Sequence, residues 1–149
     1  MYLPQLALVG VLVGLMMTTL DQVDGLLGFK QSVGVAGQLY CLGMPARDVL
    51  VKLYDDDSGP DLDDILASGK TDERGWFRLE GFTREWGEIE PKINIYHDCA
   101  NNRKLCQRKI TREIPKTYIS KGTKPVSLFN IGMLELSHKQ PGETQDCLH

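Results

Sequence analysis

The chain has 149 residues, a length that fits one small domain, and its 17 basic and 20 acidic side chains give a net charge of −3. The charge is unevenly distributed along the sequence. Residues 26–102 carry 14 acids against 8 bases, whereas residues 103–124 carry eight bases and one acid, a net charge of +7 (8 − 1). Such a stretch attracts an anionic partner if the fold gathers it on one face.

Residues 1–20 are predicted to be a signal peptide. Residues 6–20 form an apolar run without a charged residue, and Asp21 and Asp24 follow it. Fifteen residues fall short of the roughly 20 that a membrane-spanning helix needs, so the run favours a signal peptide over an anchor. No clear small-x-small cleavage motif is present, and we expect cleavage between residues 19 and 26. We therefore expect a secreted, extracellular protein that does not span the membrane, with one domain over residues 27–149.

The pattern after residue 31 predicts β-strands, and no stretch after the signal peptide has a sustained helical period. Apolar alternation predicts strands over residues 33–41, 49–54 and 92–99, and extended segments follow over residues 107–120 and 126–137. Residues 71–75 have the composition of a tight turn, with Gly75 in a left-handed conformation. Phe77 and Leu79 then share one inward face. About seven short strands separated by turns predict an all-β Greek-key β-sandwich.

The four cysteines, Cys41, Cys99, Cys106 and Cys147, are an even set in a chain expected to be exported, and they predict two disulfides rather than a metal site. Three pairings are possible. Because only a short reversal of the chain separates Cys99 from Cys106, we expect these two to pair. Cys41 is then left to pair with Cys147, closing a loop of about 100 residues worth ~4–5 kcal/mol in the chain-entropy model.

An acidic stretch with six aspartates in ten residues covers positions 55–64. Clustered carboxylates are the ligands that Ca²⁺ prefers, but the spacing does not fit an EF-hand, because Gly59 and Pro60 fall on its fifth and sixth positions and no Glu closes the loop. We therefore expect a solvated loop, and we predict neither a metal nor another cofactor. The weak calcium candidates are Asp55, Asp57, Asp61 and Asp63.

A series of short motifs runs in order along the chain after residue 31. They are residues 32–35 (SVGV), 37–41 (GQLYC), 45–46 (PA), 51–54 (VKLY), the 55–64 loop, 69–72 (GKTD) with Gly75 and Phe77, 95–99 (IYHDC), 114–115 (IP), 118–119 (YI), 142–143 (GE) and 146–147 (DC). In this order the motifs resemble the transthyretin-like family of secreted nematode proteins. The resemblance implies a transthyretin-like β-sandwich, export from the cell and a role in binding rather than in metabolism. Some family members are linked to exposed phosphatidylserine and to bridging toward cell-surface receptors.

A more distant similarity to transthyretin itself and to the hydroxyisourate hydrolases covers residues 43–54 and 68–75. Those hydrolases use a His on the first strand, an Arg and a second His deeper in the chain, and a C-terminal Tyr-Arg-Gly-Ser. This chain has no His in its first strand and ends Gln-Asp-Cys-Leu-His. A hydrolase is therefore the least favoured function, and we predict that the protein is not an enzyme. We interpret His97, which shares a face with Ile93 and Ile95, as a hydrogen-bonded structural histidine.

The basic stretch is the feature that we connect to function. We predict a non-catalytic extracellular binding protein that recognises an anionic phospholipid or glycan surface and bridges it to a cell-surface receptor, each Lys or Arg contributing about 1 kcal/mol near a membrane. A solvated basic edge that prevents strand pairing is the structural alternative. Carriage of a small hydrophobic ligand is a second function, suggested by the fold, and nucleic acid is not an expected partner. The expected anion-binding residues are Arg103, Lys104, Arg108, Lys109, Arg112 and Lys116.

Overall fold

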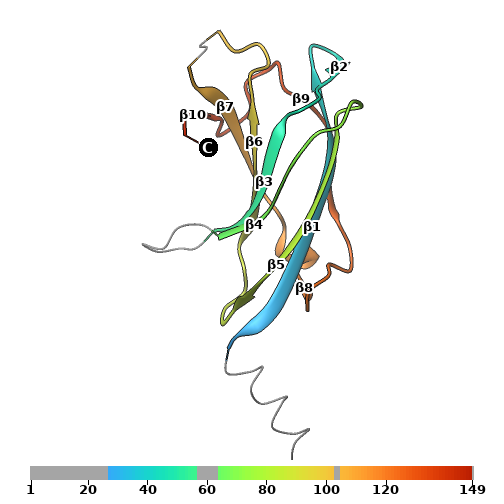
Figure 1. Ribbon diagram of the computed structural model, residues 1–149, viewed down its shortest axis with the longest axis vertical. Helices are drawn as coiled ribbons and strands as arrows, with labels where there is room; N and C mark the ends of the chain where they lie inside the picture. The colour runs from blue at the N-terminus through green and yellow to red at the C-terminus, as the bar shows by residue number, and fades with distance from the viewer. Residues whose placement is uncertain (1–26, 57–63, 103–104, 149) are drawn as a thin grey trace, which may run out of the picture.

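The computed structural model describes residues 27–56, 64–102 and 105–148, which form two β-sheets packed face to face (Figure 1). The helical structure in these residues is one turn of 3-10 helix, η1 (Lys116–Tyr118). Within the same residues, no helix is both long and apolar enough to cross a membrane. The all-β sandwich expected from the sequence is confirmed.

The first sheet is built around the long strand β1 (Phe29–Cys41). Along one side, β1 pairs antiparallel with β5 (Trp76–Glu85) and, near its end, with the short β2 (Met44–Pro45). It also pairs with the short β8 (Ser120–Lys121), antiparallel, and with β9 (Phe129–Glu135), parallel. Segments separated by about 90 residues of sequence are therefore neighbours in one sheet, as a Greek-key fold requires.

The second sheet is antiparallel throughout. Seven of the described strands in the two sheets have six residues or more, in agreement with the expected number of about seven. In spatial order the strands of this sheet are β10 (Thr144–Asp146), β7 (Gln107–Glu113), β6 (Pro91–His97), β3 (Leu50–Asp55) and β4 (Asp64–Lys70).

The core lies between the sheets and is supplied by alternate residues of each strand, because successive side chains of a strand point to opposite faces. Val33, Val35 and Leu39 of β1 are fully buried, and Phe77 and Leu79 face them from β5, as the alternation predicts. Each aliphatic side chain buried in this way contributes roughly 1.5–3 kcal/mol. The opposite sheet contributes Val51, Leu53, Ile93, Ile95 and Ile110.

The predicted turn over residues 71–75 is confirmed. Asp72 Oδ1 accepts hydrogen bonds from the backbone N–H groups of Arg74 and Trp76, and Thr71 Oγ1 donates to Ala46 O at 2.6 Å. Gly75 has a φ of +77°, and a Cβ at this position would lie 2.3 Å from Leu39 O. Only glycine fits this contact, so the turn is fixed against β1.

The expected disulfide pairing is wrong, because Cys41 is bonded to Cys99 and Cys106 to Cys147. Cys41 ends β1 and Cys99 follows β6, so the first bond joins the two sheets. The second bond follows from the pairing of β7 with β10: Asp146 is opposite Gln107, which places Cys147 opposite Cys106. The short distance along the chain between Cys99 and Cys106 does not decide their partners, since the sheets bring other cysteines closer to each.

Candidate functional site

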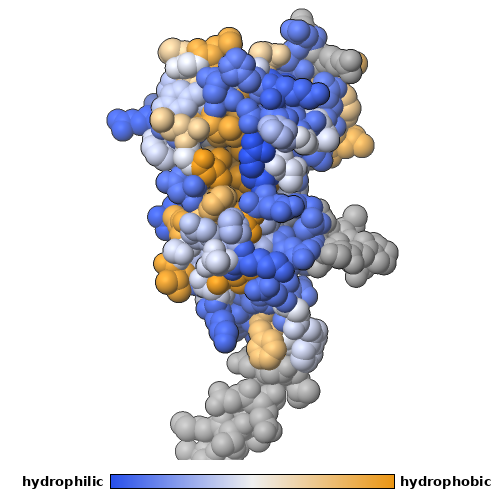
Figure 2. Space-filling view, turned by 180° about the vertical axis from the view of Figure 1, so that it is seen from behind, coloured by the Kyte–Doolittle hydropathy of each residue, from blue (hydrophilic) through white to orange (hydrophobic). Residues whose placement is uncertain are grey.

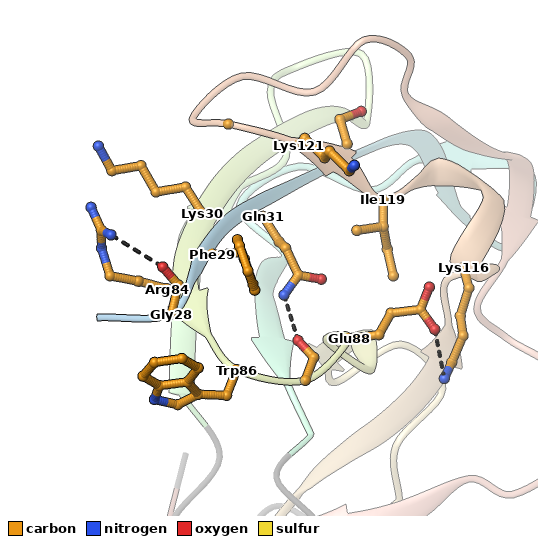
Figure 3. Close-up of a pocket in the computed structure, with 13 residues that line it drawn as sticks. Gly28, Phe29, Lys30, Gln31, Arg84, Trp86, Glu88, Lys116, Ile119 and Lys121 are labelled. Carbon is orange, nitrogen blue, oxygen red and sulfur yellow. Dashed lines mark hydrogen bonds and ion pairs between the residues drawn. The ribbon is translucent and has the colours of Figure 1, made fainter. Parts of the chain in front are cut away.

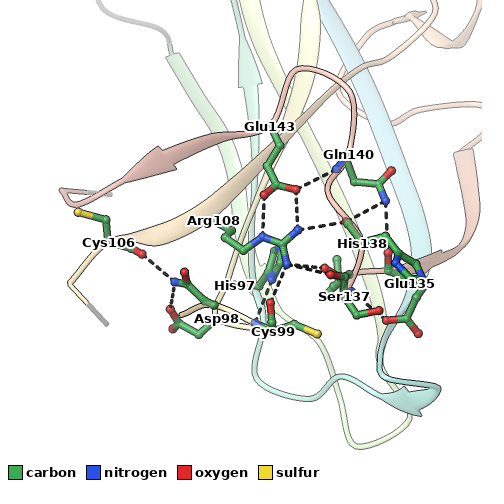
Figure 4. Close-up of polar contacts among 12 residues, drawn as sticks. His97, Asp98, Cys99, Cys106, Arg108, Glu135, Ser137, His138, Gln140 and Glu143 are labelled. Atoms are coloured by element: carbon green, nitrogen blue, oxygen red, sulfur yellow. Dashed lines mark hydrogen bonds and ion pairs between the residues drawn. The ribbon is translucent and has the colours of Figure 1, made fainter. Parts of the chain in front are cut away.

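Among the residues that the structure describes, the basic stretch of residues 103–124 does not form one surface. Arg108, in β7, is 7% exposed, and its guanidinium makes a two-point contact with Glu143 (Figure 4). The Nη1 group also donates to the backbone oxygens of Cys99 and Leu136, at 2.7 and 2.8 Å. Hydrogen bonding to Arg108 lowers the pKa of Glu143, so this pair stays charged. The prediction that Arg108 binds an anionic partner is wrong, because its donors are used inside the fold.

Of the other predicted anion-binding residues, those that the structure describes are dispersed. Lys109 is half-buried, with Nζ 3.5 Å from Asp146 Oδ2, and Arg112 Nη2 donates to Gln140 Oε1 at 2.9 Å. These two residues hold the C-terminal segment against β7. Lys116 is exposed and lies at the other end of β7, whereas Arg103 and Lys104 lie outside the described residues. Of the predicted set, Lys116 alone is placed by the structure in the pocket described below.

The acidic candidates for calcium are not assembled into a site by the described residues. Asp55 is 2% exposed, and its Oδ1 accepts a hydrogen bond of 2.7 Å from the Glu90 N–H. Asp55 therefore links β3 to the loop before β6 and is buried, whereas we expected it in a solvated loop. Asp57, Asp61 and Asp63 lie outside the described residues, and within those residues no cluster of three or more His, Cys, Asp or Glu is able to hold a metal.

His97 ends β6 and is 2% exposed. Its Nδ1 accepts a hydrogen bond of 3.1 Å from the Cys99 N–H, so the proton of the neutral ring is on Nε2, which has no partner among the described residues. Burial, together with the charge of Arg108, lowers the pKa of His97 to about 4. The interpretation of His97 as a hydrogen-bonded structural histidine is confirmed.

A pocket of about 710 Å³ lies at the end of the sandwich where β1 begins, and we call this region the pocket end (Figure 3). Apolar and cationic side chains dominate its lining. The apolar side chains are Phe29, Trp86 and Ile119, the cationic ones Lys30, Arg84, Lys116 and Lys121, and Glu88 is the acid.

The local structure explains why the pocket is apolar. Phe29 and Gln31 occupy inward-facing positions of β1 beyond the last layer of the core. The Gln31 amide is satisfied within the protein, since Nε2 donates to Gly87 O at 2.6 Å and Oε1 accepts from the Ile89 N–H at 3.2 Å. Gln31 therefore closes the inner end of the pocket without offering free polar groups, while Phe29 and Ile119 form its walls (Figure 3).

The pocket end has a positive electrostatic character. Four cations and one carboxylate line the pocket, a net charge of +3 (4 − 1). Lys30 lies opposite Arg84 in the pairing of β1 with β5, whereas Lys121 lies opposite Gln31 in the pairing with β8. Lys116 is 3.2 Å from Glu88, whose hydrogen bond raises the pKa of the lysine.

The two aromatic residues of the pocket end are unusually accessible. Phe29 is 61% and Trp86 67% exposed. Exposed aromatic side chains beside cations are typical of surfaces that contact a partner or a membrane interface. Charge counting along the sequence missed this arrangement, because Lys30 and Arg84 are 54 positions apart; the signal was an aromatic residue next to a cation, at residues 29–30, and near one, at residues 84–86.

A second exposed apolar surface, the turn-end patch, lies at the opposite end of β1. Trp76 and Met133 flank Gln38 from the two neighbouring strands and therefore share its face of the sheet. The 13 residues of β1 separate the two ends by roughly 40 Å. Exposed hydrophobic residues are visible near both ends of the molecule in Figure 2. The turn-end patch consists of Trp76 and Met133, which are 45% and 74% exposed; Leu42 and Met44, in and beside the turn that follows β1, are 74% and 69% exposed.

Two sheets joined by a disulfide, with a parallel β1–β9 pair inside the first sheet, define a small disulfide-bonded β-sandwich. The chain belongs to the transthyretin-like family, whose model matches residues 36–115. The resemblance found in the sequence motifs is thereby confirmed.

Several relatives from Caenorhabditis elegans align over most of the chain. Transthyretin-like protein 5 is 52% identical over 124 residues, which cover 83% of this chain and 89% of the relative. Transthyretin-like protein 33 is 51% identical over 121 residues, covering 81% and 85%. Transthyretin-like protein 1 is 37% identical over 142 residues and covers 91% of both chains.

Proposed function

We propose that the protein is an exported, non-catalytic binding protein that attaches to anionic phospholipid surfaces through its pocket end and presents the turn-end patch to a cell-surface receptor. The observation that carries the proposal is the exposure of Phe29 and Trp86 beside Lys30, Arg84 and Lys121. The basic surface is therefore assigned to different residues from those expected along the sequence, with Lys116 common to both sets.

The chemistry of this end matches a negatively charged membrane. Aromatic rings favour the boundary between headgroups and acyl chains, and each Lys or Arg near an anionic surface contributes about 1 kcal/mol. Lys30 and Lys121 have no ion-pair partner among the described residues, so both ammonium groups are available. These two lysines give roughly 2 kcal/mol, which makes attachment reversible and dependent on salt.

Export is supported by the two disulfides. Bonds of this kind form and persist in oxidising compartments and are rare in the cytosol. The uncharged run over residues 6–20 has the length of a signal-peptide core. We therefore place the attachment surface outside the cell.

A catalytic role is not proposed, because acid–base catalysis requires titratable groups positioned together around an accessible site. His97 is buried and neutral at physiological pH, and its Nδ1 is occupied by the Cys99 N–H. The expected negative result is checked by a turnover assay with hydroxyisourate, in which product formation above the uncatalysed rate would contradict this part of the proposal.

Sedimentation with lipid vesicles tests the attachment directly. We expect the secreted chain to bind vesicles of phosphatidylserine and phosphatidylcholine but not vesicles of phosphatidylcholine alone. Binding at about 0.05 M salt should be much stronger than at about 0.5 M, since exposed charges are screened beyond a Debye length. Equal binding to both kinds of vesicle, or none to either, would overturn the proposal.

Charge variants locate the surface. Lys30→Gln and Lys121→Gln should each weaken vesicle binding about fivefold, the equivalent of ~1 kcal/mol per cation. Lys70→Gln is the matched control, because Lys70 is an exposed lysine on β4 near the opposite end of the sandwich and changes the net charge equally. An equal loss of binding in all three variants would contradict the assignment to the pocket end.

The alternative function, carriage of a small apolar ligand, is favoured by one observation. The pocket of about 710 Å³ falls within the range of roughly 300–1,000 Å³ that is usual for small-molecule sites. Native mass spectrometry of the secreted chain should then show a bound small molecule. A clean mass of the unliganded chain under several mild conditions would count against carriage.

A further inference from the structure

We propose that the pocket end contains a discrete site for a single-chain monocarboxylate amphiphile of the medium-chain fatty-acid type. Its alkyl chain would lie between Phe29 and Ile119, and its carboxylate would lie beside Lys121. The inference rests on the proposed function in using the same end of the sandwich, and it adds the chemical class of ligand that enters the pocket.

The walls select an alkyl chain. Phe29 approaches the hollow from β1, and Ile119 approaches it from the position between η1 and β8 (Figure 3). The polar atoms of Gln31 are already bonded to Gly87 O and the Ile89 N–H. A ligand with many hydrogen-bonding groups would leave those groups unpaired in this part of the pocket, which is costly, whereas an alkyl chain loses nothing there.

The charges select one negative charge on the ligand. Lys121 is exposed and has no ion-pair partner among the residues that the structure describes, so its ammonium group is free to meet a carboxylate. Lys116, across the pocket, is already shared by Glu88 and Glu90, at 3.2 and 3.7 Å. Glu88 would repel a second negative charge on the ligand, so a monocarboxylate fits better than a dianion.

The probe for the experiment is decanoate, with decanol as its uncharged counterpart. Trp86 lines the pocket and Trp76 lies at the other end of β1, so Trp86 fluorescence in a Trp76→Phe background reports on the pocket end. We expect saturable binding of decanoate and at least about fivefold weaker binding of decanol, because decanol lacks the charge that meets Lys121. Chemical-shift changes should be concentrated at residues 28–31 and 119–122.

Two variants separate the contribution of the apolar pocket wall from that of the lysine charge. Ile119→Asp should weaken decanoate binding by about tenfold or more, since it removes an apolar wall and adds a repelling carboxylate. Lys121→Gln should weaken binding of decanoate but not of decanol. Lys70→Gln is the charge control and should change neither. Amide chemical shifts away from the pocket verify that each variant is folded.

Three results would overturn the site. The first is the absence of saturable decanoate binding by a chain that binds phosphatidylserine vesicles, which leaves the attachment proposal intact. The second is decanoate binding that is unchanged in both Ile119→Asp and Lys121→Gln. The third is binding that weakens as the protein concentration rises, which would show that a second copy occupies the pocket. Saturable decanoate binding without vesicle binding would overturn the attachment proposal and support the site.

Discussion

Arg108 in β7 and Glu143, just before β10, form a two-point ion pair inside the fold, with Nε 2.6 Å from Oε1 and Nη2 2.8 Å from Oε2. The same guanidinium donates to the backbone oxygens of Leu136 and His138. One side chain of a central strand thus fixes the course of the chain from β9 to β10. Its charge is used for this purpose and is not available on the surface.

Removing Arg108 should therefore destabilise the protein strongly. Arg108→Ala removes the ion-pair partner of the buried Glu143 carboxylate, which keeps only the hydrogen bond from the Gln140 N–H, a loss of about 3–5 kcal/mol in the free energy of unfolding. Arg78→Ala is the matched control, because the ion pair of Arg78 with Glu80 is exposed and such pairs contribute ~0–1 kcal/mol. Urea unfolding curves measure both changes. Equal losses of unfolding free energy in the two variants would show that the buried ion pair contributes no more to stability than the exposed one.

The disulfide pairing is testable by peptide mapping of the unreduced secreted chain. We expect one cross-linked fragment containing Cys41 with Cys99 and another containing Cys106 with Cys147. Sequence separations of 58 and 41 residues correspond to ~4 kcal/mol for each bond in the chain-entropy model. A fragment linking Cys99 to Cys106 would contradict the structure.

The strands were predictable because their core faces alternate with a period of two, and the 71–75 turn because its composition is local. The cysteine pairing was not, since it depends on which strands become neighbours across the sheets. The face of each basic residue was readable in principle: Arg108 shares its parity with the fully buried Ile110, which indicates the core side of β7. Counting charges along residues 103–124 discarded that information.

The pocket end depends on long-range pairing and for this reason was not predictable. Phe29 and Lys30 meet Arg84 and Trp86 through the antiparallel pairing of β1 with β5, and Lys121 joins them through β8. Each pairing closes a long loop, and a shift by one residue would send every side chain to the opposite face. The exposed aromatic residues were visible in the sequence, but their common location was not.

Acidification should weaken the fold through His97. Its pKa is about 4 in the folded protein and near 6.5 when unfolded, so the unfolded chain binds the extra proton first. This contribution to stability is complete above about pH 6.5 and is lost progressively as the pH falls toward about 4. We expect a lower urea midpoint at about pH 5 than at about pH 7, and a smaller difference in His97→Gln.

The Glu135 carboxylate is the reference for this prediction, because it titrates at lower pH than His97. Glu135 accepts hydrogen bonds from the Ser137, Gly43 and Leu42 N–H groups, which lower its pKa to about 2. Its contribution is lost as the pH falls from about 4.5 toward 2, below the range assigned to His97. A His97→Gln variant that loses as much stability between pH 7 and pH 5 as the parent would contradict the role given to His97.

Gly75 should tolerate substitution less than Gly43, although their φ angles of +77° and +78° are nearly equal. An added Cβ at Gly75 would lie 2.3 Å from Leu39 O, whereas nothing lies within 4 Å of one at Gly43. Gly43→Ala should cost about 1 kcal/mol for the left-handed backbone alone, and Gly75→Ala several times more. Unfolding midpoints of the two variants isolate the steric contact, and equal midpoints would exclude it.

We expect the turn-end patch to contact the receptor independently of lipid binding. Trp76 and Met133 lie on one face of the first sheet, on either side of Gln38, and are 45% and 74% exposed. Tryptophan is one of the residues enriched among those that contribute most binding energy at protein interfaces. The double variant Trp76→Ser with Met133→Ser should therefore reduce binding of labelled protein to receptor-bearing cells by about tenfold or more. Binding of this double variant to phosphatidylserine vesicles should be unchanged.

Phe82→Ser is the matched control for this patch. Phe82 is 51% exposed and pairs with Ser32, so it lies on the same outer face as Trp76 but nearer to the pocket end. It should leave cell binding unchanged if the receptor contacts the turn-end patch. An equal loss of cell binding in Phe82→Ser would mean that the whole outer face of the first sheet contacts the receptor. Unchanged cell binding in the double variant would show that the turn-end patch is not part of the interface. Because the two ends of β1 are roughly 40 Å apart, a single molecule then has room to hold lipid and receptor at the same time.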